Sequence, residues 1–158
     1  MRRLILAIAA LTALTVAPVQ AQAPAQSADE QAIRAVIKQL FDGMRTRDTT
    51  MMKNVFAPDA RFYGVNAQGV VRVTLPAQFI TGIAAAPAGT VLDEVLHETE
   101  VRIDGPLATV WAYYDLFVGD RFSHCGFDAM QMLKTAAGWK IVALADSRRM
   151  EGCKQKRS

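Results

Sequence analysis

Four polar side chains in the second half of the sequence have the chemistry of a small-molecule site. They are His97, Tyr114, Asp146 and Arg148. A histidine can act as a general base near neutral pH, and a tyrosine hydroxyl can donate a hydrogen bond to a developing oxyanion. An arginine can hold an acidic group, with an aspartate beside it as its orienting partner. We therefore take His97 and Tyr114 as candidate catalytic residues, and Tyr114, Asp146, Arg148 and Phe127 as candidate ligand-binding residues.

Strands joined by tight turns must bring these side chains together. Alternation of apolar residues predicts strands over Val91–Ile103, Leu107–Val118, Arg121–Thr135 and Trp139–Asp146. Two-residue turns at 105–106 and 119–120 favour hairpins, and pairing through the first of them sets His97 opposite Tyr114. One face of the predicted antiparallel sheet then carries all four polar residues among apolar neighbours. Apolar walls with a few placed polar groups are typical of a ligand pocket.

Two other interpretations of these residues stay open. The polar groups can be satisfied within the protein, with the histidine bonded to the tyrosine and the aspartate paired to the arginine, since buried polar groups normally find partners. A one-residue change of register would also exchange the two faces of a strand. In that case His124, oriented by Asp115, becomes the candidate catalytic base.

The opposite face of the predicted sheet carries large apolar side chains. Among them are Trp111, Tyr113, Phe117 and Trp139. In a monomer these groups would face water, and an exposed patch of this kind usually marks an interface. We therefore expect a homodimer that forms through this face of the sheet.

The chain before these strands reads as helices and one hairpin. Ser27 and Glu30 form a capping box at the start of a predicted amphipathic helix. A second, shorter helix follows Asp48 and is stopped by Pro58. Strands over 61–65 and 70–75 form a hairpin, and a third short helix begins at Pro76. Helices first and a strand meander afterwards predict an α+β fold, with the helices on one face of an antiparallel sheet.

Residues 1–23 have the pattern of an export signal. Arg2 and Arg3 precede an apolar run, which is too short to span a bilayer, and Ala21-Gln22-Ala23 supplies a cleavage site. Residues 24–27 are expected to be a disordered lead-in, 28–153 one domain, and 154–158 a basic tail. We expect a periplasmic or secreted protein that has no membrane contact once the signal is cleaved.

The charge of the chain excludes a nucleic-acid role. Removing Arg2 and Arg3 from the 18 basic residues leaves 16 against 15 acidic ones, a net charge of +1. Five of the basic residues lie in the segment 148–157, so the rest of the domain has no basic face for a polyanion. The expected partner is a small apolar or acidic organic ligand.

Cys125 and Cys153 are the only cysteines of the sequence. An even count in an oxidising compartment favours a disulfide. Pairing about the last turn places Cys125 near Arg148, a few residues before Cys153. The bridge therefore requires the tail to double back, and two free thiols are the alternative.

Other chemistries lack their sequence signatures. The chain has no glycine-rich phosphate loop, no metal-ligand spacing and no serine on a nucleophile elbow. We therefore expect neither a cofactor nor a metal.

Two segments carry a resemblance to a known superfamily. They are Phe122-Ser123-His124-Cys125-Gly126, and Gly138-Trp139-Lys140-Ile141-Val142 followed by Asp146-Ser147-Arg148-Arg149. Together with the order of elements, they resemble the nuclear transport factor 2-like superfamily, in an exported branch that is SnoaL-like or lumazine-binding-like. The resemblance implies a cone-shaped fold, in which a strongly curved antiparallel or mixed sheet wraps around the N-terminal helices over a pocket. It implies little about function, because this fold carries many chemistries.

Three functional hypotheses follow. The first is an exported protein that binds a small molecule in this pocket, or has an accessory role, without catalysis. The second is a cofactor-independent lyase or isomerase with a histidine base. The third is a non-catalytic dimeric interaction module.

Overall fold

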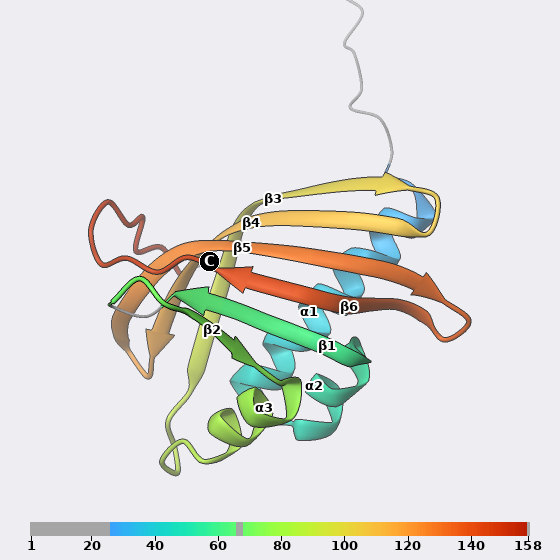
Figure 1. Ribbon diagram of the computed structural model, residues 1–158. Coiled ribbons are helices and arrows are strands. Elements are labelled where there is room, and N and C mark those ends of the chain that lie inside the picture. The colour runs from blue at the N-terminus through green and yellow to red at the C-terminus, as the bar shows by residue number, and fades with distance from the viewer. Residues whose placement is uncertain (1–25, 66–67, 158) are drawn as a thin grey trace, which may run out of the picture.

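The computed structural model describes residues 26–65 and 68–157 as one α+β domain (Figure 1). The predicted signal segment, residues 1–23, lies outside the described residues. Within the described part of the chain, no helix is long and apolar enough to cross a membrane.

Three helices and six strands make up the domain. The helices are α1 (Ala28–Thr46), α2 (Thr49–Val55) and α3 (Pro76–Ala84). The strands are β1 (Phe56–Val65), β2 (Val71–Thr74), β3 (Leu92–Asp104), β4 (Leu107–Val118), β5 (Arg121–Thr135) and β6 (Gly138–Asp146). They form a single sheet in the order β2-β1-β6-β5-β4-β3, in which only the β1–β6 pairing is parallel.

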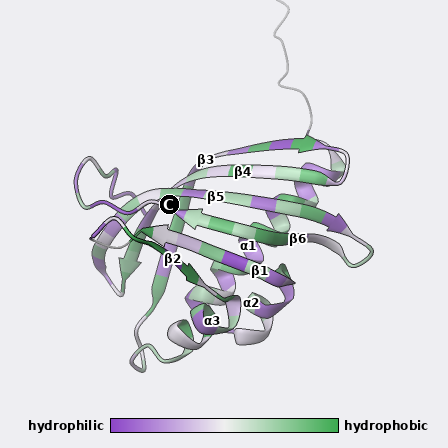
Figure 2. Ribbon diagram, viewed as in Figure 1, coloured by the Kyte–Doolittle hydropathy of each residue, from purple (hydrophilic) through white to green (hydrophobic). Residues whose placement is uncertain are grey.

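The sheet bends around the helices, which all lie on its concave side (Figure 1). Apolar and polar residues alternate along the strands (Figure 2), so that one face of the sheet is available for a core. The buried core lies between this face and the helices, with Ile33, Leu40 and Met52 from the helices against Met130 and Ile141 from the sheet. The predicted cone-shaped α+β fold with a curved, mixed sheet is confirmed.

Local signals set the ends of α1. The Ser27 hydroxyl accepts a hydrogen bond from the Glu30 amide at 3.1 Å, which satisfies one of the free N–H groups of the first turn. The helix ends where Arg47 adopts a left-handed conformation with φ of 56°. The Trp139 indole Nε1 donates to Asp29 at 3.0 Å and so ties β6 to the first turn of α1. Trp139 is therefore a core residue, and its predicted position on the outer face of the sheet is wrong.

Three one-residue bulges give the sheet its register. The extra residue lies at Glu98–Thr99 in β3, at Ser123 in β5 and at Val142 in β6, and Glu98 takes a φ of 48°. A bulge bends its strand. It also shifts the pairing register by one, so that every residue beyond the bulge lies opposite a different residue of the facing strand. His97 therefore pairs with Tyr113, not with Tyr114 as the turns predict.

Gly126 marks the tightest approach of backbone to backbone in β5. A Cβ atom at this position would lie 1.8 Å from the Ser147 carbonyl oxygen and 2.9 Å from Cε1 of Tyr114. Only glycine lets the chain after β6 pass this close to the sheet.

Replacement of Gly126 by alanine therefore tests the approach of this segment. We expect Gly126→Ala to lose about 1–3 kcal/mol of stability, the usual range for an overfilled site, because the Ser147 backbone must move. Gly82→Ala is the matched control, since no heavy atom lies within 4 Å of its added methyl group. In helix α3 that change should raise stability by about 0.5–1 kcal/mol. Urea unfolding measures both variants, and equal midpoints would contradict the account.

Candidate ligand-binding pocket

A pocket of about 740 Å³ lies between the concave face of the sheet and the helices. Its walls are mainly apolar side chains from α1, α3, β1 and the middle of the sheet. They include Leu40, Phe41, Met44, Phe62, Phe79, Ile83, Leu92, Leu116 and Leu144. Such a chamber can enclose a molecule of drug-like size.

Ten polar side chains also line this pocket. Four of them are Tyr63, Arg72, Thr74 and Ser147, and the other six are Glu94, Tyr114, His124, Asp128, Asp146 and Arg148. Tyr114, Asp146 and Arg148 were predicted here from the sequence, and His124 only for the exchanged register. Glu94 and Asp128 were not predicted, and they carry the most unusual electrostatics of the pocket.

Glu94 and Asp128 form a carboxyl pair in which one group holds a proton. Burial, then the charge of Asp128 and a hydrogen bond to it, raises the pKa of Glu94 well above its usual range. Burial also raises the pKa of Asp128 to about 7, even though its hydrogen bond to Glu94 acts in the opposite direction. Asp128 Oδ2 is buried, and no donor among the described residues reaches it. Because a carboxyl donates only when protonated, Glu94 is the donor and Asp128 the acceptor.

Tyr114 presents its ring to the pocket and uses its hydroxyl within the protein. The hydroxyl donates to the Ser147 carbonyl oxygen at 2.8 Å, and only 2% of the residue is exposed. Burial, followed by the nearby acidic groups Glu94, Asp146 and Asp128, raises the pKa of Tyr114 and keeps the hydroxyl neutral. Tyr114 therefore holds the segment after β6 in place, and its partner is Ser147 and not the His97 side chain that the structural interpretation paired with it.

His124 lies on the pocket side as a neutral imidazole. Burial, then the charge of Arg148, lowers the pKa of His124 to about 4. Its Nδ1 lies 2.9 Å from the Ser123 hydroxyl, and its ring meets the Tyr114 ring edge-on. The predicted pair of His124 with Asp115 does not form, because Asp115 points to the outer face, where it pairs across the strands with Cys125.

His97 and Phe127 are placed on the outer face, contrary to the sequence analysis. His97 Nε2 lies 3.3 Å from Asp115 Oδ2, and Phe127 stacks on Trp111 with 5.0 Å between ring centroids. The bulge at Glu98–Thr99 turns His97 outward, and the bulge at Ser123 does the same to Phe127. His97 and Tyr114 therefore do not meet in one chamber.

One signal in the sequence of β5 points to Asp128. The apolar Met130 and Met132 flank the polar Gln131, and this alternation places the even-numbered positions on the core face. The structure agrees, since Met130 and Met132 are almost fully buried, whereas Gln131 and Leu133 are exposed. Pairing through the turn overruled this pattern because a bulge leaves no signature in the sequence.

Asp146 and Arg148 lie at the exposed end of the pocket. The Asp146 charge disfavours ionisation of Glu94 and Asp128, while the Arg148 charge favours ionisation of Glu94. With one proton on the Glu94–Asp128 pair and a neutral His124, the two remaining carboxylates and the two arginines, Arg72 and Arg148, give the pocket a net charge of about zero at neutral pH. The three pocket carboxylates do not form a metal-ligand cluster; among the described residues, only Asp115, Cys125 and Cys153 on the outer face do.

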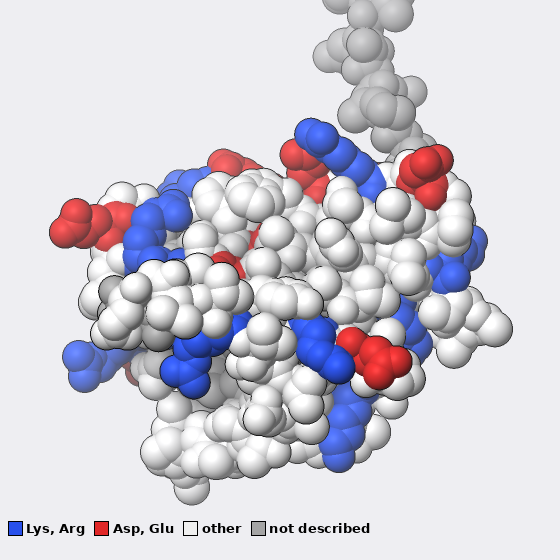
Figure 3. Space-filling view, viewed as in Figure 1, with Lys and Arg blue, Asp and Glu red and all other residues white. Residues whose placement is uncertain are grey.

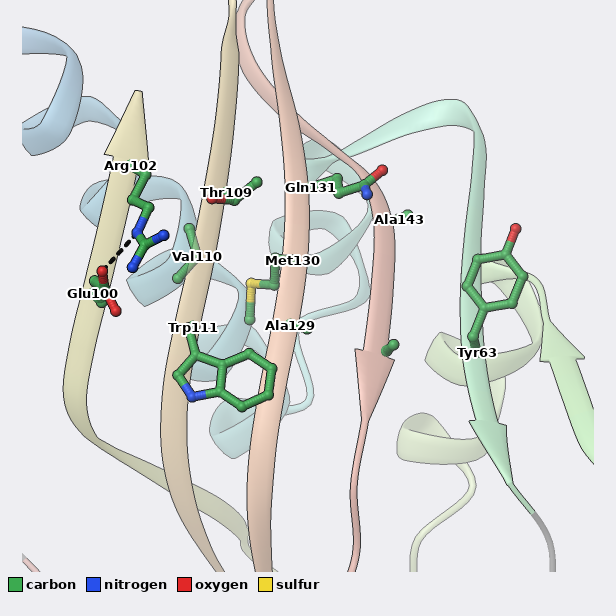
Figure 4. A pocket seen from close by; sticks show the side chains of 11 residues that line it. Tyr63, Glu100, Arg102, Thr109, Val110, Trp111, Ala129, Met130, Gln131 and Ala143 are labelled. Atoms are coloured by element: carbon green, nitrogen blue, oxygen red, sulfur yellow. Dashed lines mark hydrogen bonds and ion pairs between the residues drawn. The ribbon is translucent and has the colours of Figure 1, made fainter. Parts of the chain in front are cut away.

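A second hollow of about 680 Å³ lies on the outer face, beside the exposed Trp111 (Figure 4). Trp111 is 51% exposed, and Glu100 and Arg102 form an ion pair at the rim. The space-filling view shows a broad uncharged area over β4 to β6, with charged side chains around it (Figure 3). Association of two copies through this face stays a prediction.

Comparison with solved structures identifies the class of fold. An NTF2-like protein of unknown function from Shewanella baltica OS155 superposes with a TM-score of 0.61 at 18% identity, covering 75% of this chain and 92% of that chain. A protein of unknown function with a cystatin-like fold from Nostoc punctiforme PCC 73102 gives 0.63 at 13% identity, with 79% and 95% covered. A dehydratase assigned as putative, from the NTF2-like family of Streptomyces avermitilis, gives 0.60 at 14% identity, with 76% and 95% covered.

The chain therefore has the NTF2-like fold, with its pocket between sheet and helices. More particularly, residues 28–145 match the family described as "Putative lumazine-binding", and the chain belongs to that family. No curated protein matches it. The resemblance to the nuclear transport factor 2-like superfamily and to a lumazine-binding-like domain is confirmed.

The carboxyl pair makes stability depend on pH in a defined direction. The pKa of Asp128 is about 7 in the folded protein against 3.8 for an ordinary aspartate, so the folded state binds more protons between these values. Stability must then fall as pH rises from about 4 to about 7. A change of roughly three in pKa corresponds to a penalty of at most about 4 kcal/mol above pH 7.

Asp128→Asn removes this penalty. We expect the variant to be more stable than the parent protein at pH 8, with the gain shrinking to nothing near pH 4. The control Asp104→Asn changes an exposed strand residue and should show no such trend. Urea midpoints across this pH range measure both variants. A gain that does not depend on pH would contradict the buried charge.

Proposed function

We propose that the protein binds a small, uncharged and largely apolar molecule in the pocket between sheet and helices. The main evidence is a largely apolar chamber of about 740 Å³ that is lined at one end by the Glu94–Asp128 pair, in which one of the two carboxyl groups holds a proton. The apolar walls supply affinity by burial, and the Glu94–Asp128 pair supplies one donor and one acceptor to orient a carbonyl or hydroxyl group. The family and its fold support a ligand-binding role without naming the ligand.

The charge of the pocket favours an uncharged ligand over an acidic one. Its two cations, Arg72 and Arg148, both have exposed side chains. An anion entering the chamber would lie close to Asp128 and Asp146, and like charges in a poorly hydrated site repel strongly. An acidic ligand was one alternative from the sequence, and the carboxyl pair argues against it.

Export is part of the proposal and rests on the sequence pattern of residues 1–23. A charged start, a short apolar run and a small-x-small site support cleavage and a periplasmic or secreted location. The intact mass of the protein recovered from its native compartment would reveal whether this segment has been removed.

A matched pair of probes tests the ligand class. We expect 2-naphthol to bind the purified protein, and 2-naphthoate to bind at least about tenfold more weakly, a difference of about 1.4 kcal/mol. Asp128→Asn should narrow this gap because it removes the repelling charge. Isothermal titration at pH 8 measures both affinities.

Two variants locate the binding site. Ile83→Trp should block binding, because Ile83 lies in the pocket wall and the larger side chain fills the chamber. Trp111→Ala should leave binding unchanged, since Trp111 lines the hollow on the outer face. Tighter binding of the naphthoate, or loss of binding only in Trp111→Ala, would contradict the proposal.

Proton-transfer catalysis is a second candidate function, favoured by the pKa of Asp128. A base whose pKa is about 7 is well matched to proton abstraction at neutral pH, and the protonated Glu94 carboxyl can donate to a developing enolate oxygen. The structural neighbour named as a putative dehydratase lends this candidate some support. Asp128 is a better base here than His124, whose pKa is lowered to about 4, or His97, which lies on the other face.

Exchange of deuterium into 2-tetralone tests this candidate. We expect the protein to accelerate exchange at the protons next to the carbonyl, and Asp128→Asn to slow it by a factor of about 10² to 10⁴. His97→Gln should have no effect. Proton NMR in D₂O follows the reaction; exchange at the buffer rate, or an equal loss in His97→Gln, would exclude Asp128 as the base.

A further inference from the structure

We propose that the outer face of the sheet holds a redox-controlled site for a thiophilic metal ion such as Zn²⁺. Its ligands are Cys125, Cys153, Asp115 and His97, all of which lie away from the pocket. In the oxidised protein the two cysteines form a disulfide with 5.7 Å between their Cα atoms. Reduction of this bond provides two thiolates beside a buried carboxylate.

Three of the four ligands already lie together. One ligand atom each from Asp115, Cys125 and Cys153 lies within 4.8 Å of the other two. Asp115 and Cys125 have no exposed surface. Two thiolates bound to tetrahedral zinc lie about 3.8 Å apart, given Zn–S bonds of about 2.3 Å. Once the disulfide is reduced, rotation of the two cysteine side chains can separate the sulfur atoms to this spacing, because the two backbones already lie close together.

His97 is the candidate for the fourth metal ligand, and its ring nitrogen Nε2 forms no hydrogen bond. Nε2 lies 3.3 Å from Asp115 Oδ2 without forming a hydrogen bond to it, and this buried nitrogen has no hydrogen-bond partner among the described residues. An unpartnered buried nitrogen is costly unless something else binds it. The nitrogen and oxygen ligands of a tetrahedral zinc ion are also about 3.3 Å apart. His97 thus supplies the fourth ligand.

The tail that carries Cys153 has contacts besides the disulfide. The Lys154 amide donates to the Tyr113 hydroxyl at 2.8 Å, and the Lys156 amide donates to Asp115 Oδ2 at 3.2 Å. Arg157 pairs with Asp120 and lies over the Phe117 ring. These contacts keep Cys153 near Cys125 after reduction, so the site does not depend on the bridge that it replaces.

The reaction requires a dithiol reductant, and the charges of the site then balance. The dithiol transfers two electrons and two protons to the disulfide, becomes a disulfide itself and leaves two cysteine thiols. Binding of Zn²⁺ releases the two thiol protons, so the ion meets two thiolates and the Asp115 carboxylate. The resulting charge of −1 is offset by Arg149 and Lys154, whose side chains lie over the neighbouring Tyr113 ring. Thiolate ligands select for soft ions, and imidazole also suits Zn²⁺.

Metal titration of the full chain in two redox states tests the site. Protein reduced anaerobically with dithiothreitol and then freed of the reductant should bind about one Zn²⁺ per chain, and the oxidised protein should bind none. Co²⁺ in place of Zn²⁺ should give the visible absorption of a tetrahedral ion and a thiolate charge-transfer band. Elemental analysis and absorption spectra measure these results.

Variants assign the ligands. Cys153→Ser should abolish the charge-transfer band or halve it, and His97→Gln and Asp115→Asn should each weaken Zn²⁺ binding by about tenfold or more. His124→Gln, which removes the other histidine of the sequence, is the matched control and should bind normally. Zn²⁺ bound equally by the oxidised protein, or binding unchanged in Cys153→Ser, would overturn the proposal.

Loss of the disulfide can also unfold the reduced chain, since such bridges contribute about 2–5 kcal/mol. The proposal then predicts that Zn²⁺ restores the circular dichroism spectrum and raises the melting temperature of the reduced protein, because a metal bound only by the folded state stabilises it. Restoration should fail in His97→Gln and succeed in His124→Gln. A reduced chain that stays unfolded with Zn²⁺ would overturn the proposal as well.

Discussion

The bend of the sheet around the helices is the constraint on which the other features depend. A flat sheet could not enclose α1 and α3 and leave a chamber. Bulges bend the strands that carry them, and this sheet has bulges at Glu98–Thr99, Ser123 and Val142. Each bulge also reverses which side chains of a strand face inward relative to the neighbouring strand. The polar groups that face the pocket are thus set by the same three bulges that bend the sheet. Without the bulge at Ser123, Asp128 and His124 would point away from the chamber.

The carboxyl pair of the pocket shows how an apolar chamber tolerates acidic groups. Two charged carboxylates at this depth would repel each other and lose their hydration, so one keeps its proton. Glu94 and Asp128 come from β3 and β5, which are separated by β4, and this arrangement exists only in the folded sheet. The folded state gives up stability to hold them together at neutral pH. Groups kept together at such a cost are typical of functional sites, and this supports a role in binding or proton transfer.

The sequence predicts the elements of this protein better than it predicts their faces. The capping box at Ser27 and the alternation from β3 to β6 depend on local interactions, and the structure contains both features. The predicted inward direction of His97 and Phe127 depended instead on counting residues from a turn. A single bulge between the turn and the residue changes the register and makes this count wrong. Glycine at 126 shows the same limit, since its necessity comes from Ser147, far along the chain. Register in a curved sheet is a property of the whole packing, so turn residues alone cannot fix it.

The segment after β6 links the two faces of the sheet. Its first residues form the rim of the pocket, where Ser147 accepts the Tyr114 hydrogen bond and its hydroxyl accepts from the Phe127 amide at 2.9 Å. A few residues later the same segment pairs with Cys125 through Arg149 and ends in the bridge to Cys153. The disulfide therefore restrains the backbone that carries Arg148 at the mouth of the chamber. A change at the outer face, whether reduction or metal binding, acts on a chain only five residues from that mouth. Because Gly126 leaves no free space beneath Ser147, a shift of the tail must be accommodated at Tyr114, and so within the pocket itself.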